Sequence, residues 1–407
     1  MRPAVITLEE VREARHRIAG TIRPTPLDRS DTFSRLFARA VALKPEHLQR
    51  TGSFKVRGAT NFVSRLPPGT EVVAASAGNH AQGVALAATR AGLTSTIFMP
   101  RTAALPKVQA TRGYGARIEL VGDTVDDAIA AGQAYTAERG AAFVPPFDDP
   151  LVIAGQGTIG LELAEEAPDA EVVIVPVGGG GLISGVAAAL AQLADRHGRR
   201  RPRVIGVEAT GAAGMVASLG AGACVTLSSA ATMADGIAIK GPSPLTLAHV
   251  QAYVDDVITV DEDDISRAVV LLLERAKAVV EPAGAVSVAA LLAGKIPGQG
   301  LAVALLSGGN VDPFLLLRLI DRGLSASGRY LLLKVLVEDH PGALAALTAA
   351  IAAMGLNVLN VEHHRSGLVL PLEQVEVVLT LETRDPEHRE QVVEALVAQG
   401  YRVEMVG

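Results

Sequence analysis

One lysine lies where the end of a helix disfavours a positive charge. Residues 51–59 read Thr-Gly-Ser-Phe-Lys-Val-Arg-Gly-Ala, and Ser53 is typical of an N-cap residue, which would put Lys55 in the first helical turn. The positive end of the helix dipole favours the neutral amine there. A neutral amine attacks carbonyl compounds to form Schiff bases. An ordinary surface lysine would fit the same motif, so the choice between a reactive and a surface lysine depends on the other loops.

A run of four glycines, Gly178, Gly179, Gly180 and Gly181, follows the apolar segment 171–177 and precedes a helix expected from Leu182. Without side chains, the N–H groups of such a loop can close around a phosphate. The spacing from Gly179 to Gly185, Gly-x-Gly-x-x-x-Gly, is not the dinucleotide fingerprint, and no P-loop is present. A tight turn would need only one or two glycines. The run therefore favours another phosphate-bearing ligand.

Two shorter loops also follow apolar segments. Residues 76–80 offer free N–H groups to a carboxylate, and residues 307–310 begin with a hydroxyl that could meet a ring nitrogen without charging it. Helix capping alone would explain serine and asparagine in either loop. Together with Lys55 and the glycines, however, they supply what pyridoxal phosphate chemistry on an amino acid requires. The loops contain Ser76, Ala77, Gly78, Asn79 and His80, and Ser307, Gly308, Gly309 and Asn310.

The elements around these loops alternate between short apolar strands and helices. Such alternation predicts an open, mostly parallel α/β sheet region in two lobes, with ligands at the carboxyl ends of the strands. Residues 1–322 form this expected region, and the small polar stretch 323–328 looks like a linker. Residues 329–407 follow the order β-α-β-β-α-β, which predicts a small ferredoxin-like domain without an acid, base or nucleophile cluster.

Composition excludes several classes of function. The chain of 407 residues has 37 Lys and Arg against 43 Asp and Glu, and only 3% aromatic residues, which argues against nucleic acid. The apolar stretch 268–280 is interrupted by charges and is short of a membrane span. The N-terminus lacks the apolar core of a secretory signal, and the single cysteine, Cys224, fits a structural thiol in a reducing compartment. We expect a cytoplasmic protein whose partners are small molecules and copies of itself, as a dimer or tetramer.

These motifs, in this order along nearly the whole chain, resemble pyridoxal phosphate enzymes of the tryptophan synthase β-chain fold type, in the threonine dehydratase and serine racemase branch. Residues 146–150, Pro-Phe-Asp-Asp-Pro, and Glu281-Pro282 also fit. The resemblance implies pyridoxal 5'-phosphate as cofactor, with a Schiff base at Lys55. It further implies that Phe54 flanks the cofactor ring, Asn79 contacts its hydroxyl, Gly178–Leu182 hold the phosphate, Ser307 meets the pyridine nitrogen, and Ser76–His80 receive the substrate carboxylate.

Two positions bear on the reaction within this branch. Similar racemases carry a serine where this chain has Ala77, which has no proton to deliver to the far face of the substrate. The family's divalent cation site would map onto Glu208, the carbonyl of Ala212 and a position occupied here by Gly214, so one charged ligand is missing. We therefore expect a dehydratase and assign no metal ligands, with a monovalent ion or none at this place.

The C-terminal unit resembles the ACT domain, with Glu338–Ala343 at the usual ligand loop, and this implies allosteric feedback by an amino acid such as isoleucine or valine. The leading interpretation is dehydration and deamination of L-threonine to 2-oxobutanoate and ammonia, as in isoleucine biosynthesis. L-serine or 3-hydroxyaspartate dehydration and serine racemisation are enzymatic alternatives. An amino-acid sensor with a silent catalytic scaffold is the non-enzymatic one.

Overall fold

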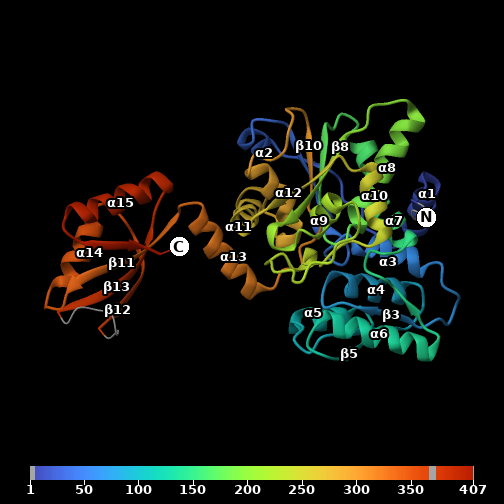
Figure 1. Ribbon diagram of the computed structural model, residues 1–407, viewed down its shortest axis with the longest axis horizontal. Coiled ribbons are helices and arrows are strands. Elements are labelled where there is room, and N and C mark those ends of the chain that lie inside the picture. The colour runs from blue at the N-terminus through green and yellow to red at the C-terminus, as the bar shows by residue number, and fades with distance from the viewer. Residues whose placement is uncertain (1–4, 366–372, 407) are drawn as a thin grey trace. The chain divides into compact units, whose positions relative to one another are not determined.

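The computed structural model describes residues 5–365 and 373–406 (Figure 1). The chain divides into two compact units, Met1–Leu316 and Leu317–Gly407. The boundary falls within helix α13 (Pro313–Ala326), so the stretch from Gly323 that looked like a linker is helical through Ala326. The apolar residues Leu319 and Leu324 of this helix are buried. The helix therefore has an apolar packed face, which the small polar residues of 323–328 do not suggest.

The first unit contains a six-stranded sheet with the strand order β1-β2-β10-β7-β8-β9. All neighbours from β2 to β9 are parallel, and only the short β1 pairs antiparallel. Apolar residues of β7, β8 and β10 are buried under helices α7 and α8, as expected of parallel strands covered on both faces. The strands are β1 (Asp28–Arg29), β2 (Val41–Lys44), β7 (Val172–Pro176), β8 (Arg203–Ala209), β9 (Asp256–Val260) and β10 (Ala302–Leu305).

The same unit contains a second, four-stranded parallel sheet with the order β5-β4-β3-β6. Its core includes alanines of α4 that pack close to β3 and β4. The expected two lobes of parallel α/β structure are confirmed. The strands are β3 (Val72–Ala75), β4 (Ser95–Met99), β5 (Arg117–Leu120) and β6 (Ala142–Phe143).

Helices join the strands of both lobes (Figure 1). Several begin at side-chain caps; Thr124, for example, caps α6 in a capping box. The helices are α1 (Leu8–Ile18), α2 (Asp31–Leu36), α3 (Lys55–Val63), α4 (Asn79–Arg90), α5 (Leu105–Gly113), α6 (Val125–Arg139), α7 (Pro150–Glu166), α8 (Gly181–His197), α9 (Gly214–Ala221), α10 (Pro244–Tyr253), α11 (Glu262–Leu271) and α12 (Pro282–Leu292), with short turns η1 (Glu46–Leu48), η2 (Thr210–Ala212), η3 (Asp235–Ile237) and η4 (Leu272–Ala276).

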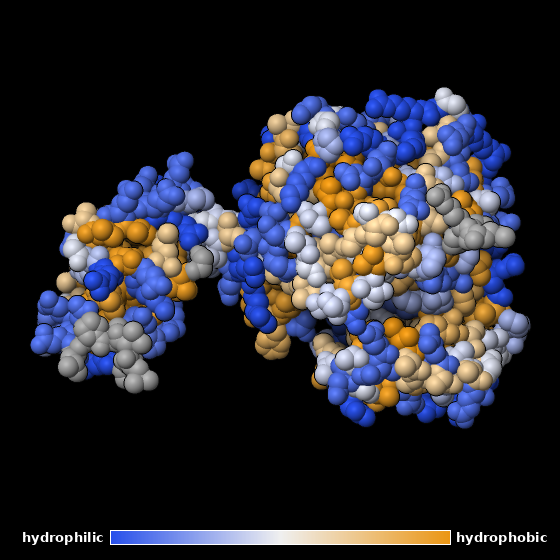
Figure 2. Space-filling view, in the orientation of Figure 1, coloured by the Kyte–Doolittle hydropathy of each residue, from blue (hydrophilic) through white to orange (hydrophobic). Residues whose placement is uncertain are grey.

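The second unit is an antiparallel sheet of order β12-β13-β11-β14 with two helices, the expected β-α-β-β-α-β order. One face of β11 and β13 is buried under α14 and α15. On the opposite face Leu332, Leu336 and Val378 are half-exposed, and Figure 2 shows apolar residues gathered over these strands. The elements are β11 (Tyr330–Glu338), α14 (Ala343–Ala353), β12 (Val358–His364), β13 (Gln374–Glu382), α15 (Pro386–Ala398) and β14 (Arg402–Met405).

The single cysteine lies differently from what the sequence suggests. Cys224 is exposed rather than packed in a core, because it lies in the loop after α9. In the part of the chain that the structure describes, no helix is both long and apolar enough to cross a lipid bilayer.

Candidate active site

Lys55 is the first residue of α3, close to where the sequence places it, but Ser53 is not the cap. Phe54 occupies the N-cap position without a side-chain hydrogen bond. Ser53 instead forms an isolated antiparallel bridge with Gly308, and the N–H of Phe54 donates to the Ser307 carbonyl at 3.1 Å. This pairing keeps the backbone extended through Ser53, so the helix begins later than expected.

The amine of Lys55 is held by few groups. Its Nζ donates to the carbonyl of Pro146 at 2.8 Å and lies 5.3 Å from the centre of the Phe54 ring. Burial lowers the pKa of Lys55 to about 8, and the negative charge of Glu281 opposes this only in part. A substantial fraction of the amine is therefore neutral near pH 8, as nucleophilic chemistry requires.

The glycine loop joins β7 to α8, with Gly180 at the N-cap in a left-handed conformation, φ +92°. The N–H groups of Gly178, Gly179 and Gly180 donate to no acceptor within residues 5–365 and 373–406. Unpaired donors at a helix N-terminus suit a phosphate dianion. Leu182 follows in the first turn of α8, with its side chain buried in the core of the larger sheet.

Phe147 connects the glycine loop to the lysine. A Cβ at Gly179 would overlap the phenyl ring of Phe147, and a Cβ at Gly181 would overlap its Cβ, so Phe147 packs directly against the glycine backbone. The preceding residue, Pro146, accepts the hydrogen bond from Lys55. The short segment between β6 and α7 therefore contacts the lysine and the glycine loop at once.

The loop Ser76–His80 follows β3 and opens α4, whose first residue is Asn79. The N–H groups of Ala77, Asn79 and His80 have no acceptor in the described chain, whereas that of Gly78 donates to Ser76 Oγ at 3.2 Å. Three free donors in one loop suit a carboxylate. His80 Nε2 donates to the Val144 carbonyl at 2.8 Å, and burial together with the charge of Lys55 lowers the pKa of His80 to about 3. The imidazole is neutral at working pH.

A chain of side-chain amides fixes the orientation of Asn79. Asn310 Nδ2 donates to the Thr51 carbonyl at 2.7 Å and to Asn79 Oδ1 at 2.8 Å, and Asn79 Nδ2 donates to Glu281 Oε1 at 2.6 Å. Burial raises the pKa of Glu281 to about 7. The sequence motifs contain both Asn310 and Glu281, but no spacing rule predicts that they meet at Asn79, because 231 and 202 positions separate them from it.

Ser307 lies two residues beyond the end of β10 with its side chain buried, 4% exposed, and its Oγ lies 3.5 Å from the Ala283 carbonyl. That contact is long for an O–H···O hydrogen bond, so the hydroxyl keeps hydrogen-bonding capacity. A Cβ at the next residue, Gly308, would overlap Glu281 and lie 3.1 Å from Asn79 Nδ2. The Ser307 loop therefore touches both the lysine loop and the Asn79 loop, and all four sequence-predicted loops meet.

Glu208, the residue mapped to a possible cation site, is buried and already has partners. Its two carboxylate oxygens accept hydrogen bonds from the N–H groups of Met215 and Val216 at 2.8 and 2.9 Å. Burial raises the pKa of Glu208 to about 7. The described residues contain no cluster of three His, Cys, Asp or Glu side chains that could hold a metal ion. Glu208 here caps the first turn of α9.

The unpaired donors, the depressed lysine pKa and the available Ser307 hydroxyl fit pyridoxal phosphate, and comparison with known families agrees. Residues 18–308 match the family described as "Pyridoxal-phosphate dependent enzyme". The chain belongs to this family of pyridoxal phosphate enzymes. Residues 331–400 match the ACT domain, as the C-terminal topology suggests. The fold type, the cofactor and the ACT domain expected from the sequence are therefore confirmed.

Individual relatives of this pyridoxal phosphate enzyme are similar over most or all of its length. An L-threonine ammonia-lyase of Thermotoga maritima is 46% identical and covers 99% of this chain and 100% of its own. A solved threonine deaminase structure from T.th. is 40% identical, with a TM-score of 0.70 over 75% of this chain and 99% of its own. A maize serine racemase structure is 35% identical, with a TM-score of 0.73 over 79% and 99%.

Proposed function

We propose that the protein is a pyridoxal phosphate-dependent L-threonine ammonia-lyase. The observation that carries the proposal is the meeting of the four loops at Lys55, two of them with unpaired N–H donors, in a chain 46% identical over its full length to an L-threonine ammonia-lyase. The reaction removes water from L-threonine, and the resulting aminocrotonate hydrolyses to 2-oxobutanoate and ammonia.

We assign the site residues as follows. The N–H groups of Gly178–Leu182 bind the phosphate, Phe54 flanks the ring, Ser307 meets its nitrogen and Asn79 its hydroxyl. Bound pyridoxal phosphate supplies an electron sink that acidifies the substrate Cα–H bond. The N–H groups of Ala77, Asn79 and His80 hold the substrate carboxylate. Because the Asn310–Asn79–Glu281 chain fixes the Asn79 amide, that amide is already oriented before anything binds.

Lys55 serves as the base. The free Nζ would remove the Cα proton, and its pKa of about 8 keeps much of the amine neutral in the physiological range. His80 is unsuited to this role, because its pKa of about 3 makes the neutral imidazole a weak base. The β-hydroxyl then leaves. Ala77 has no proton to return to the opposite face, which disfavours serine racemisation even though a racemase is among the similar structures.

The test is a steady-state assay of purified protein with pyridoxal phosphate over L-threonine, L-serine and 3-hydroxyaspartate. We expect 2-oxobutanoate from L-threonine at the highest kcat/KM. A preference for serine or hydroxyaspartate would mean that the substrate differs from the one proposed, while the elimination chemistry stays the same. Absence of any 2-oxoacid together with absence of visible cofactor absorbance would favour the amino-acid sensor.

We further propose that the C-terminal unit imposes feedback by a branched-chain amino acid, isoleucine or valine, bound near Glu338–Ala343. The T.th. threonine deaminase matches 75% of this chain over 99% of its own length, so a relative exists with the catalytic part alone. Deleting residues 329–407 should keep activity and remove the feedback. Unchanged inhibition after the deletion would refute an ACT effector site.

We propose that the protein is a cytoplasmic homo-oligomer, a dimer or tetramer, and the half-exposed apolar face of the C-terminal sheet supports the association. Half-exposed residues such as Leu332, Leu336 and Val378 lose contact with water when a second surface covers them. We propose the division into a catalytic region of residues 1–322, a connection at 323–328 and a regulatory domain of 329–407. Sedimentation of the full chain and of the deletion variant would measure how much of the association depends on the C-terminal domain.

A further inference from the structure

A cavity of about 550 Å³ lies at the opposite end of the catalytic unit's β7 and α8 from the glycine loop. The glycine loop joins the end of β7 to the start of α8, whereas the cavity is lined by Val173 at the beginning of β7 and by His197 at the end of α8. Helix α8 has 17 residues, so about 25 Å separates its two ends. The cavity is therefore separate from the candidate active site.

The inner wall of the cavity is apolar. Leu161, Leu163, Val173 and Leu190 line it, and each is at most 4% exposed. Small side chains, including those of Ala164 and Ala194, leave space that larger residues would fill. A volume of 550 Å³ falls within the range of about 300–1,000 Å³ that is typical of small-molecule sites.

The rim of the cavity is basic. It includes seven Arg or His residues against two glutamates, Glu9 and Glu165. Both glutamates are already paired: Arg15 binds Glu165 through two hydrogen bonds of 2.5 and 2.8 Å, and Arg12 lies 3.8 Å from Glu9. The basic residues are Arg12, Arg15, His16, His197, Arg199, Arg200 and Arg201.

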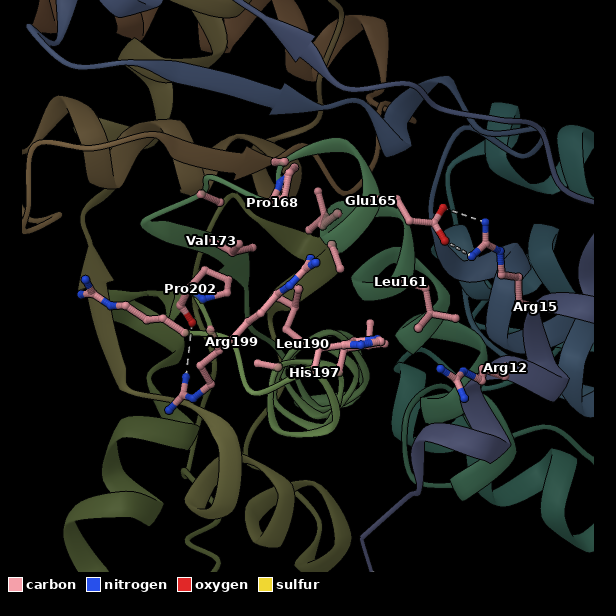
Figure 3. Close-up of a pocket in the computed structure, with 18 of the residues that line it drawn as sticks. Arg12, Arg15, Leu161, Glu165, Pro168, Val173, Leu190, His197, Arg199 and Pro202 are labelled. Carbon is pink, nitrogen blue, oxygen red and sulfur yellow. Dashed lines mark hydrogen bonds and ion pairs between the residues drawn. The ribbon is translucent and has the colours of Figure 1, made fainter.

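Arg199 has no acidic partner within the described residues. Figure 3 shows its guanidinium extending across the cavity from the side of Leu190, while Arg12 and Arg15 come from α1 on the other side. Arg201, by contrast, is paired with Asp255 at 2.6 Å. The cavity thus combines an apolar wall with an unneutralised guanidinium reaching across it.

We propose that this cavity binds an anion with an extended apolar body, of the class of medium-chain acyl carboxylates. The apolar wall would cover the chain, and Arg199 would bind the carboxylate head in the two-point geometry that a guanidinium favours. Basic residues at the end of α8 also complement the helix dipole. Arg199 lies beyond that helix and reaches over the cavity, so the dipole does not explain its position.

Calorimetric titration of the full-length holoenzyme tests the proposal with three probes. Decanoate carries both chain and charge, decyltrimethylammonium carries a similar chain with the opposite charge, and acetate carries the charge alone. We expect saturable one-site binding of decanoate and at least tenfold weaker binding of the other two. Equal binding of decanoate and decyltrimethylammonium would overturn the role of the basic rim. Binding of acetate as tight as that of decanoate would overturn the role of the apolar wall.

Two variants locate the site, and one serves as a matched control. Arg199→Gln should weaken decanoate binding at least tenfold, and Ala194→Leu should abolish it by filling the cavity. Arg196→Gln removes an exposed arginine of the last turn of α8 that does not line the cavity, and should leave binding unchanged. Unaltered cofactor absorbance establishes that each variant is folded. Wild-type affinity in Ala194→Leu, or equal effects of the two arginine variants, would contradict the proposal.

Discussion

Helix α3 contains two basic residues, Lys55 and Arg57, whose surroundings shift the side-chain pKa in opposite directions. Arg57 is fully buried and hydrogen-bonds both Glu46 and Glu162; although burial alone would lower its pKa, the two carboxylates raise it above its ordinary value. Lys55 has one carbonyl partner, and burial lowers its pKa to about 8. A buried charge stays charged where it is paired, so pairing separates the structural cation from the reactive amine.

The largest expected effect comes from removing the reactive amine of Lys55. Lys55→Ala should lower kcat at least about 10³-fold, because the variant has neither the amine that holds the cofactor nor the base. The visible absorbance of the lysine-bound cofactor should disappear as well. Steady-state 2-oxobutanoate formation and an absorption spectrum measure the two losses. Substantial turnover without Lys55 would contradict its assignment.

Substituting methionine at Arg57 and at Lys55 tests whether pairing with carboxylates makes a buried cation stabilising. Arg57→Met should lower the free energy of unfolding by about 3–5 kcal/mol, because Glu46 and Glu162 lose their buried partner. Lys55→Met should leave it unchanged or raise it, since methionine removes a cation that has no carboxylate hydrogen-bonded to it. Urea unfolding of the cofactor-free proteins gives both values, and equal losses would show that pairing does not distinguish the sites.

A smaller effect is expected from the amide chain beside Lys55. Asn310→Leu leaves the Thr51 carbonyl and Asn79 Oδ1 without their donor, so Asn79 can rotate. One lost buried hydrogen bond is worth about 1.4 kcal/mol, which is about tenfold in kcat/KM for L-threonine. Asn310→Asp keeps the shape of the side chain but also lacks the donor, so it should lose at least as much. If thermal stability falls but kcat/KM does not, the chain is merely structural.

The pH dependence of cofactor capture measures the Lys55 amine directly. The cofactor-free protein should bind pyridoxal phosphate at a rate that rises about tenfold per pH unit at low pH and levels off above about pH 8, since only the neutral amine reacts. Glu281→Gln removes the charge that raises the pKa of Lys55, so the midpoint should move to lower pH. A rate that keeps rising to pH 10 would mean an unperturbed lysine.

The smallest effect belongs to a third cation, Lys240, which is paired like Arg57 but exposed. Lys240 Nζ lies 2.9 Å from Asp126 Oδ2, and both side chains are about half exposed or more. Lys240→Ala should change the free energy of unfolding by no more than about 1 kcal/mol, because water and salt screen such pairs. Thermal unfolding at low and high salt checks this. A loss as large as that of Arg57→Met would mean that burial adds nothing to pairing.

The sequence predicts the reactive site better than the structural one. Loops such as Gly178–Gly181 and Ser76–His80 are local motifs at strand ends, so their positions follow from the chain alone. The Arg57–Glu46–Glu162 cluster and the Asn310–Asn79–Glu281 chain join residues 11 to 231 positions apart and have no local signature. Ser53 illustrates the limit: its type predicts a cap, but its pairing with the distant Gly308 overrides that preference.

The packing of Phe147 against the glycine loop has one more consequence. Because its ring occupies the space that a side chain at Gly179 would need, and its Cβ and backbone the space at Gly181, the glycine backbone is supported whether or not a phosphate is bound. A loop held in its bound conformation loses little conformational entropy on binding, so most of the attraction to the phosphate is retained as affinity. An enzyme built in this way should survive repeated loss of its cofactor and return to full strength when the cofactor is restored.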